Sequence, residues 1–255
     1  MSEPFLVHAH IPKTGGSALN RRLVFPGFGE DRVCQLYRFV FERAQRLPTR
    51  HVSRAMRSSA AAGHVPFGYF ERLYPGALYV SVFREPESRF LSLLNFVLAN
   101  PQHKIHERLP AGLIPDQDPD GFVNAILDDP RLSVVQSNAQ TRLAAGMARL
   151  GDSAVSRVHL EIALANLDSP SYLAGDQADL NGFIAELSAR VLLPRPLPAE
   201  PPASDARLEK RLPHRITLGT LATRTRDRIA SANALDLWLY EKVRRKTAAQ
   251  TRAAA

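Results

Sequence analysis

The chain has almost no cysteine and no long apolar run. Cys34 is the single cysteine among 255 residues, so no intramolecular disulfide can form, and a buried, unreactive thiol is expected there. No stretch approaches the roughly 20 apolar residues that a membrane-spanning helix needs. The N-terminus has neither the basic segment nor the long apolar segment of a signal peptide. We therefore expect a soluble, unexported protein without a transmembrane segment, and we predict a cytoplasmic location.

Two common signatures of phosphate and metal chemistry are also missing. The Walker A spacing G-x-x-x-x-G-K-[ST] does not occur, because Lys13 precedes Gly15 and Gly16 instead of following a glycine. This order disfavours an ordinary P-loop ATPase or GTPase. No group of aspartates and glutamates has the spacing of metal ligands, so we expect no metal cofactor.

Basic residues outnumber acidic ones. The chain has 33 Lys and Arg against 25 Asp and Glu, which gives a formal charge of +8 and an isoelectric point near 10. Such an excess fits a protein that meets anions, among them nucleotides, acidic glycans, nucleic acids and anionic membranes. Part of the excess is local, in Lys242, Arg244, Arg245, Lys246 and Arg252. A solvated helix end explains that group better than a nucleic-acid arm does, so we expect no nucleic-acid partner. Peripheral membrane contact stays open.

Strand-like and helix-like segments alternate along the chain. Phe5–Ile11 and Ala77–Phe83 are the clearest strands, and amphipathic segments follow each of them. This alternation predicts an α/β protein with a P-loop-like three-layer fold, in which helices flank a central, mostly parallel sheet. The other expected elements are strands at 60–65 and 172–174, a turn at 26–30, and helices at 32–47, 86–98, 122–127, 133–143, 158–167, 180–192 and 220–245.

The chain is long enough for one α/β domain with a substantial core, since 45% of its residues are apolar. We expect a single domain over residues 1–255. Stretches rich in proline and charge at 100–121 and 193–213 are predicted loop excursions, and residues 246–255 a flexible tail.

The stretch Phe5–Leu23 organises the chain. Its apolar strand ends in a Lys-Thr-Gly-Gly turn, and a helix begins near Ser17. The N–H groups at a helix N-terminus have no partner within the helix, the glycines let a ligand approach the backbone, and Lys13 adds a positive charge. The segment can therefore hold phosphate, although a plain structural turn would have the same residues.

A second unit of this kind follows the strand Ala77–Phe83. Arg84 stands where that strand ends, a helix begins at Pro86, and Ser92 lies on the helix. Because the chain turns between them, a guanidinium and a hydroxyl could converge on one phosphate. The alternative is that Arg84 pairs with a neighbouring glutamate and that Ser92 is a surface residue.

The segments HIPKTGGSAL at His10–Leu19 and FREPESRFLSLL at Phe83–Leu94 together resemble the two cofactor signatures of the sulfotransferase superfamily. Their form is similar to that of sulfotransferase family 2, which includes the heparan sulfate 2-O-sulfotransferase group. Further matches follow in the family's order, at Gly63–Gly68, at Asn138–Arg142, and in the N-x-x-D-x-x-x-Y pattern of Asn233, Asp236 and Tyr240. The resemblance covers nearly the whole chain.

This resemblance implies in-line transfer of a sulfuryl group from 3′-phosphoadenosine 5′-phosphosulfate (PAPS) to an acceptor hydroxyl, without a metal. Positioning and charge stabilisation are the main tasks of such an enzyme, and Lys13 would stabilise the leaving bisphosphate. By matching position, the 5′-phosphosulfate would be held by Lys13, Thr14, Gly15, Gly16 and Ser17, and the 3′-phosphate by Arg84 and Ser92. The acceptor would be a hydroxyl of a carbohydrate or of a glycosylated or small molecule. It need not be a glycosaminoglycan, because the chain lacks room for an added glycan-binding region.

The acceptor hydroxyl needs a base, and histidine suits this role near neutral pH. His64 is our candidate, because it ends an expected strand and matches the position of the family's proposed base. A structural turn histidine is the alternative. His8 and His10 lie two residues apart on the first strand and should share one face of it. We expect His10 to back the phosphate turn and His8 to be structural.

Two groups of residues keep two interpretations each. Basic side chains of the 100–121 loop either face an anionic acceptor or lie in solvent; they are His103, Lys104, His106 and Arg108. A second group either contacts the acceptor or cofactor or braces its helix; it consists of Gln140, Thr141 and Arg142. Two other functions also remain: a nucleotide-binding protein without turnover, and a small-molecule kinase that uses the same phosphate turn.

Overall fold

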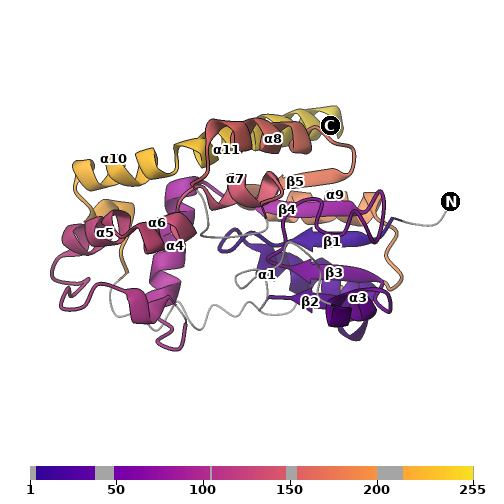
Figure 1. The fold of residues 1–255 in the computed structure, drawn as a ribbon. Helices are drawn as coiled ribbons and strands as arrows, with labels where there is room; N and C mark the ends of the chain where they lie inside the picture. Colours follow the sequence, from indigo (N-terminus) through magenta and orange to yellow (C-terminus); the bar gives the residue numbers. More distant parts are fainter. Residues whose placement is uncertain (1–3, 38–48, 104, 148–153, 200–214, 255) are drawn as a thin grey trace.

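Five parallel strands form one central sheet in the order β2-β3-β1-β4-β5. A computed structural model describes residues 4–37, 49–103, 105–147, 154–199 and 215–254 of the chain (Figure 1). The strands are β1 Leu6–Ala9, β2 Val33–Leu36, β3 Ala60–Gly63, β4 Leu78–Phe83 and β5 Tyr172–Asp176. The predicted α/β fold, with a parallel sheet flanked by helices, is confirmed.

The sheet is buried on both faces, as all-parallel sheets require. Successive residues of β1 point to opposite faces, so Val7 joins one apolar cluster and Leu6 the other. One face packs against α3 Thr49–Ala55, α7 Ala139–Ala144, α8 Arg157–Leu167 and α11 Ala234–Ala254. The other face packs against α1 Gly16–Leu19, η1 Asn20–Val24, α2 Phe25–Phe28 and α9 Leu180–Arg190.

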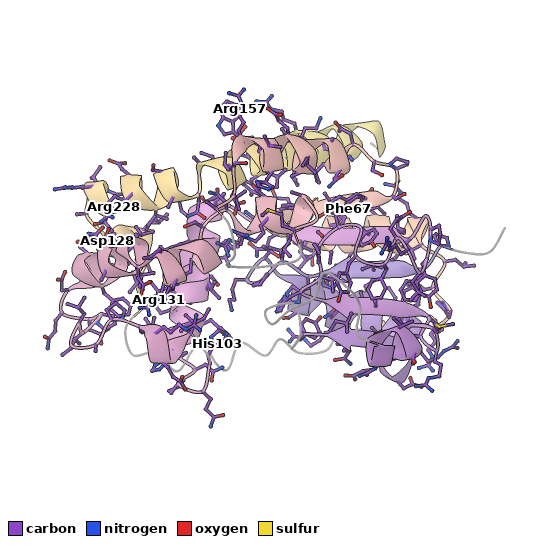
Figure 2. The ribbon with its side chains drawn as sticks, viewed as in Figure 1. Phe67, His103, Asp128, Arg131, Arg157 and Arg228 are labelled. Atoms are coloured by element: carbon purple, nitrogen blue, oxygen red, sulfur yellow. The ribbon has the colours of Figure 1, made fainter. Side chains whose placement is uncertain are left out.

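A third apolar cluster lies beyond the carboxyl ends of the strands, to the left of the sheet in Figure 1. It consists of α4 Pro86–Leu98, α5 Pro119–Asp128, α6 Pro130–Gln136 and α10 Thr223–Ala232. Arg228 of α10 forms an ion pair with Asp128 of α5 at this end of the protein (Figure 2). Because α4 begins directly after β4, this helical cluster stands next to the edge where the strands end.

Two expectations near the N-terminus are wrong. The predicted helix at 32–47 begins instead as the edge strand β2, because residues 33–36 pair in register with β3 and this pairing overrides the helical spacing. Residues 38–48 lie outside the described part. The predicted turn at 26–30 is helical through Phe28, because Pro26 stands in the first turn of α2, where proline is tolerated. Gly29, with a φ of 84°, ends that helix.

The predicted last helix at 220–245 is two helices, α10 and α11, separated at Asn233. The Asn233 amide donates to the carbonyl of Ile229 and accepts from the N–H of Asn138, so this residue ends one helix and contacts another. Helix α11 continues to Ala254, across most of the predicted tail. Residues 200–214 of the second predicted excursion lie outside the described part.

The other helices agree closely with the sequence prediction. Helix α4 starts at Pro86, with the carboxylate of Glu85 accepting from the N–H groups of Glu87 and Ser88. The 100–121 loop contains a short 3₁₀ turn, η3 His106–Arg108, before α5 begins. Within the described residues, no helix combines the length and apolar character needed to cross a membrane.

The β2–β3 register gives a test of the sheet. A Cβ on Gly63 would lie 2.4 Å from the carbonyl oxygen of Leu36 on the neighbouring strand. Gly63→Ala should therefore lower the free energy of unfolding by about 1–3 kcal/mol, since overpacking forces the backbone apart. Gly219→Ala is the matched control, because its nearest neighbour would be 3.7 Å away. Urea unfolding followed by circular dichroism measures both. Equal stabilities would contradict the register.

Candidate functional site

The turn after β1 has the backbone conformation of an anion-binding loop. Lys13 adopts a φ of 68° and Gly15 a φ of 97°, both in the left-handed region. The helical segment then runs without a break from Gly16 to Phe28 through α1, η1 and α2. No side chain of the described residues caps its first turn, so the N–H groups there point toward the space beyond β1.

Three neighbouring residues show why this turn has its sequence. Gly15 is needed for its positive φ. A Cβ on Gly16 would lie 2.2 Å from Cδ2 of His10, so the imidazole and the backbone approach too closely for any side chain there. The buried Thr14 hydroxyl donates to the carbonyl of Ile11 at 2.9 Å and closes the turn. The expectation that His10 backs the phosphate turn is therefore confirmed.

Arg84 lies directly against this turn. Its Nη1 donates to the carbonyl oxygen of Lys13 at 3.2 Å, across 71 residues of chain. Strands β1 and β4 are parallel neighbours, so the segments that follow them meet at one edge of the sheet. The two predicted halves of the nucleotide site are thus brought together.

Lys13 and Ser92 both lie toward α4. The ammonium nitrogen of Lys13 is 4.4 Å from the centroid of the Phe96 ring, a cation–π distance. Ser92 is buried and stands four residues before Phe96, so the two side chains share one face of α4. This face of α4 is therefore the one nearest the turn. Ser17, by contrast, is exposed at the start of α1.

His64 follows β3, on the other side of β1. Its Nδ1 lies 2.7 Å from the carbonyl oxygen of His10. A carbonyl can only accept, so Nδ1 carries the proton and the lone pair is on Nε2. Burial lowers the pKa of His64, the hydrogen bond to His10 opposes this, and the nearby His103 lowers the pKa further. At neutral pH the imidazole is neutral and can accept a proton.

A buried cluster of rings supports His64. Ring centroids are 4.9 Å apart for His10 and His64, 5.2 Å for Tyr37 and His64, and 5.1 Å for His8 and His10. Asn20 joins the cluster, with Oδ1 2.5 Å from Nδ1 of His8 and its amide nitrogen donating to the Tyr37 hydroxyl. His8 and His10 share a strand face as predicted. Tyr37 was missed, because it follows β2 and its position becomes visible only when 33–36 is recognised as a strand.

Burial keeps this cluster uncharged. It lowers the pKa of His8 to about 4 and that of His10 well below its usual value, and it raises the pKa of Tyr37 to about 12. The positive charges nearest His64 therefore come from Lys13 and from the 100–121 loop.

Gln140 braces the site, which decides between its two interpretations. Its amide accepts from the N–H of Arg84 and donates to the carbonyl of Arg84, both at 2.9 Å. The carboxylate of Asp236 accepts from the N–H groups of Gln140 at 3.1 Å and Thr141 at 2.7 Å. Arg142 is buried on the same helix. Tyr240 of α11 donates to Asp176 at the end of β5, so the N-x-x-D-x-x-x-Y pattern is structural here.

The 100–121 loop divides between its two interpretations. His103 stands beside the base of α4 (Figure 2), and its ring packs edge-on against Phe96 with centroids 5.7 Å apart. Arg108 is exposed on η3, and Lys104 lies outside the described residues. His103 therefore adjoins the site. Phe96 was missed as a site residue, although it lies one helical turn after Ser92.

Metal and redox chemistry find few candidates in this site. In the described ranges, no group of three or more His, Cys, Asp or Glu side chains could hold a metal ion. Cys34 is buried in β2, and burial raises the pKa of its thiol. No family model matches the chain, and no curated protein matches it. The resemblance to sulfotransferase family 2 therefore stays a prediction from the residues named above.

The buried imidazoles predict that stability falls in acid. The pKa of His8 is about 4 in the folded protein against 6.5 when exposed, so the unfolded state binds protons more readily. This contribution is fully present above pH 6.5 and is lost as the pH falls toward 4. Its loss is worth about 3 kcal/mol, and His10 and His64 shift in the same direction.

Urea unfolding of the wild type and of His8→Gln between pH 7 and pH 4 measures this effect. The variant should lose less stability than the wild type over that range, because one titrating group is gone. Identical pH slopes for the two proteins would show that His8 is not the buried neutral group described here.

Proposed function

We propose that this protein is a sulfotransferase that transfers a sulfuryl group from PAPS to a hydroxyl of a carbohydrate or a glycosylated or small-molecule acceptor. The observation that carries the proposal is the order of residues along the sheet edge. The neighbouring strands β3, β1 and β4 end respectively in a histidine, a lysine-containing anion turn and an arginine: His64, Lys13 and Arg84. A base, a charged turn for the reacting group and a second cation for a distal phosphate follow in that order.

The residues of the turn fit the 5′ end of such a donor. Gly16 allows close approach, because its backbone lies against His10 with no side chain between. The N–H groups that begin α1 have no side-chain cap among the described residues. Thr14 would contribute its N–H group, since its hydroxyl is bonded to Ile11. Arg84, beside the carbonyl of Lys13, and Ser92 on α4 would hold the 3′-phosphate.

The chemistry follows from charge and proton position. PAPS would supply the sulfuryl group and a bisphosphate leaving group. Lys13 would hold its ammonium beside the negative charge that develops on that leaving group. His64 would accept the proton of the acceptor hydroxyl at Nε2, and its lowered pKa keeps it in the accepting form at neutral pH. The positive φ of Lys13 stores backbone strain, as is common at functional turns.

Binding of 3′-phosphoadenosine 5′-phosphate tests the donor assignment. The wild type should bind it and show no comparable preference for ATP. Arg84→Ala should weaken binding by roughly 10- to 100-fold, since a hydrogen bond to a charged group is worth about 1.5–3 kcal/mol. Arg157→Ala is the matched control, because Arg157 is an exposed residue at the start of α8 (Figure 2). A preference for ATP in calorimetry would favour the small-molecule kinase.

Turnover with a labelled sulfuryl donor tests the catalytic roles. His64→Ala should lower the rate by roughly 10²- to 10⁴-fold, the usual contribution of a general base. Lys13→Gly should also abolish most turnover while the protein stays folded, because glycine accepts the positive φ without strain.

Full activity in both variants would contradict these roles. If the wild type binds the donor but transfers to no member of a broad hydroxyl panel, the protein is instead a nucleotide-binding protein without turnover.

A further inference from the structure

The backbone of Arg84 is held by a side chain instead of a strand. Strand β4 ends at Phe83, where its pairing with β5 also ends. One residue later, the fully buried amide of Gln140 satisfies both main-chain groups of Arg84: Oε1 accepts from its N–H and Nε2 donates to its carbonyl oxygen, each at 2.9 Å. This pair of bonds continues the hydrogen bonding of the sheet by one residue and fixes the direction in which the Arg84 side chain leaves the backbone.

We propose that Gln140 is a positioning residue that aims the guanidinium of Arg84 at the 3′-phosphate of the nucleotide, and so gives the site its preference for nucleotides that carry this phosphate. The inference rests on the proposed function and adds a specificity determinant to it. Arg84 is held at both ends, by Gln140 at its backbone and by the carbonyl of Lys13 at Nη1. Its guanidinium therefore has little freedom to search for a ligand.

Gln140 is itself fixed from the C-terminal helix. The buried carboxylate of Asp236 accepts from the N–H groups of Gln140 and Thr141, which begin α7. The Asn138 side chain accepts in turn from the N–H groups of Leu235 and Asp236. Side chain and backbone thus cap each other between α7 and α11. A chain of hydrogen bonds leads from α11 through Gln140 and Arg84 to the phosphate turn.

The length of glutamine matters for this role. Methionine has nearly the same length and volume but can neither donate to nor accept from the Arg84 backbone, so Gln140→Met removes both bonds without opening a large cavity. Gln140→Glu keeps an acceptor for the N–H group and loses the donor for the carbonyl. The two variants therefore remove the clamp in two steps. Gln117→Met is the matched control, because Gln117 is exposed in the 100–121 loop.

Calorimetry with two ligands tests the inference: 3′-phosphoadenosine 5′-phosphate and adenosine 5′-monophosphate, which lacks the 3′-phosphate. Gln140→Met should weaken binding of the first ligand at least 10-fold and of the second less than 2-fold, with an intermediate effect for Gln140→Glu. In an Arg84→Ala background, Gln140→Met should have no further effect on either ligand, because it acts through Arg84. Gln117→Met should match the wild type. Partial unfolding would reduce both affinities equally, so their ratio reports positioning alone.

Each contrary result has a distinct meaning. Equal weakening of both ligands by Gln140→Met and Gln140→Glu would overturn the inference, because Gln140 would then only stabilise the fold. So would unchanged binding in both variants while Arg84→Ala still weakens the first ligand, a result that leaves the proposed function standing. A wild type that binds both ligands equally would remove the proposed function and this inference with it.

Discussion

The pairing of β1 with parallel strands on both sides is the constraint on which the rest of the site depends. It brings the carboxyl ends of three strands to one edge, so that His64, the Lys13 turn and Arg84 follow one another although 71 residues separate Lys13 from Arg84. A parallel sheet needs helical connections, and these cover both of its faces. The polar groups at the edge therefore stand on a rigid, fully buried support.

Backbone carbonyls organise the side chains at this edge. Those of His10, Ile11 and Lys13 accept from His64, Thr14 and Arg84, respectively; each group is thereby oriented by the main chain of the same turn. This arrangement couples the base to the anion turn without direct contact between charged groups. It also explains the imidazole pair on β1, since His10 fills the space that Gly16 leaves.

Much of this could be predicted from the sequence, because strand and helix patterns such as 78–83 and 86–98 are strong and local. The phosphate turn and its backing by His10 also follow from residue types at close spacing. What could not be predicted depends on contacts between distant segments. The short edge strand β2 looked helical, so Tyr37 was overlooked, and the amide pairing between Gln140 and the Arg84 backbone spans 56 residues.

The cap that Asp236 places on α7 has a consequence for how the protein is made. Arg84 and Gln140 leave the ribosome long before Asp236, which lies 96 residues after Gln140 and near the end of the chain. All five strands are synthesised by residue 176, yet the start of α7 lacks its acceptor until α11 has emerged and docked. The sheet can thus assemble during synthesis, whereas the arginine end of the nucleotide site is completed only as the last helix is released.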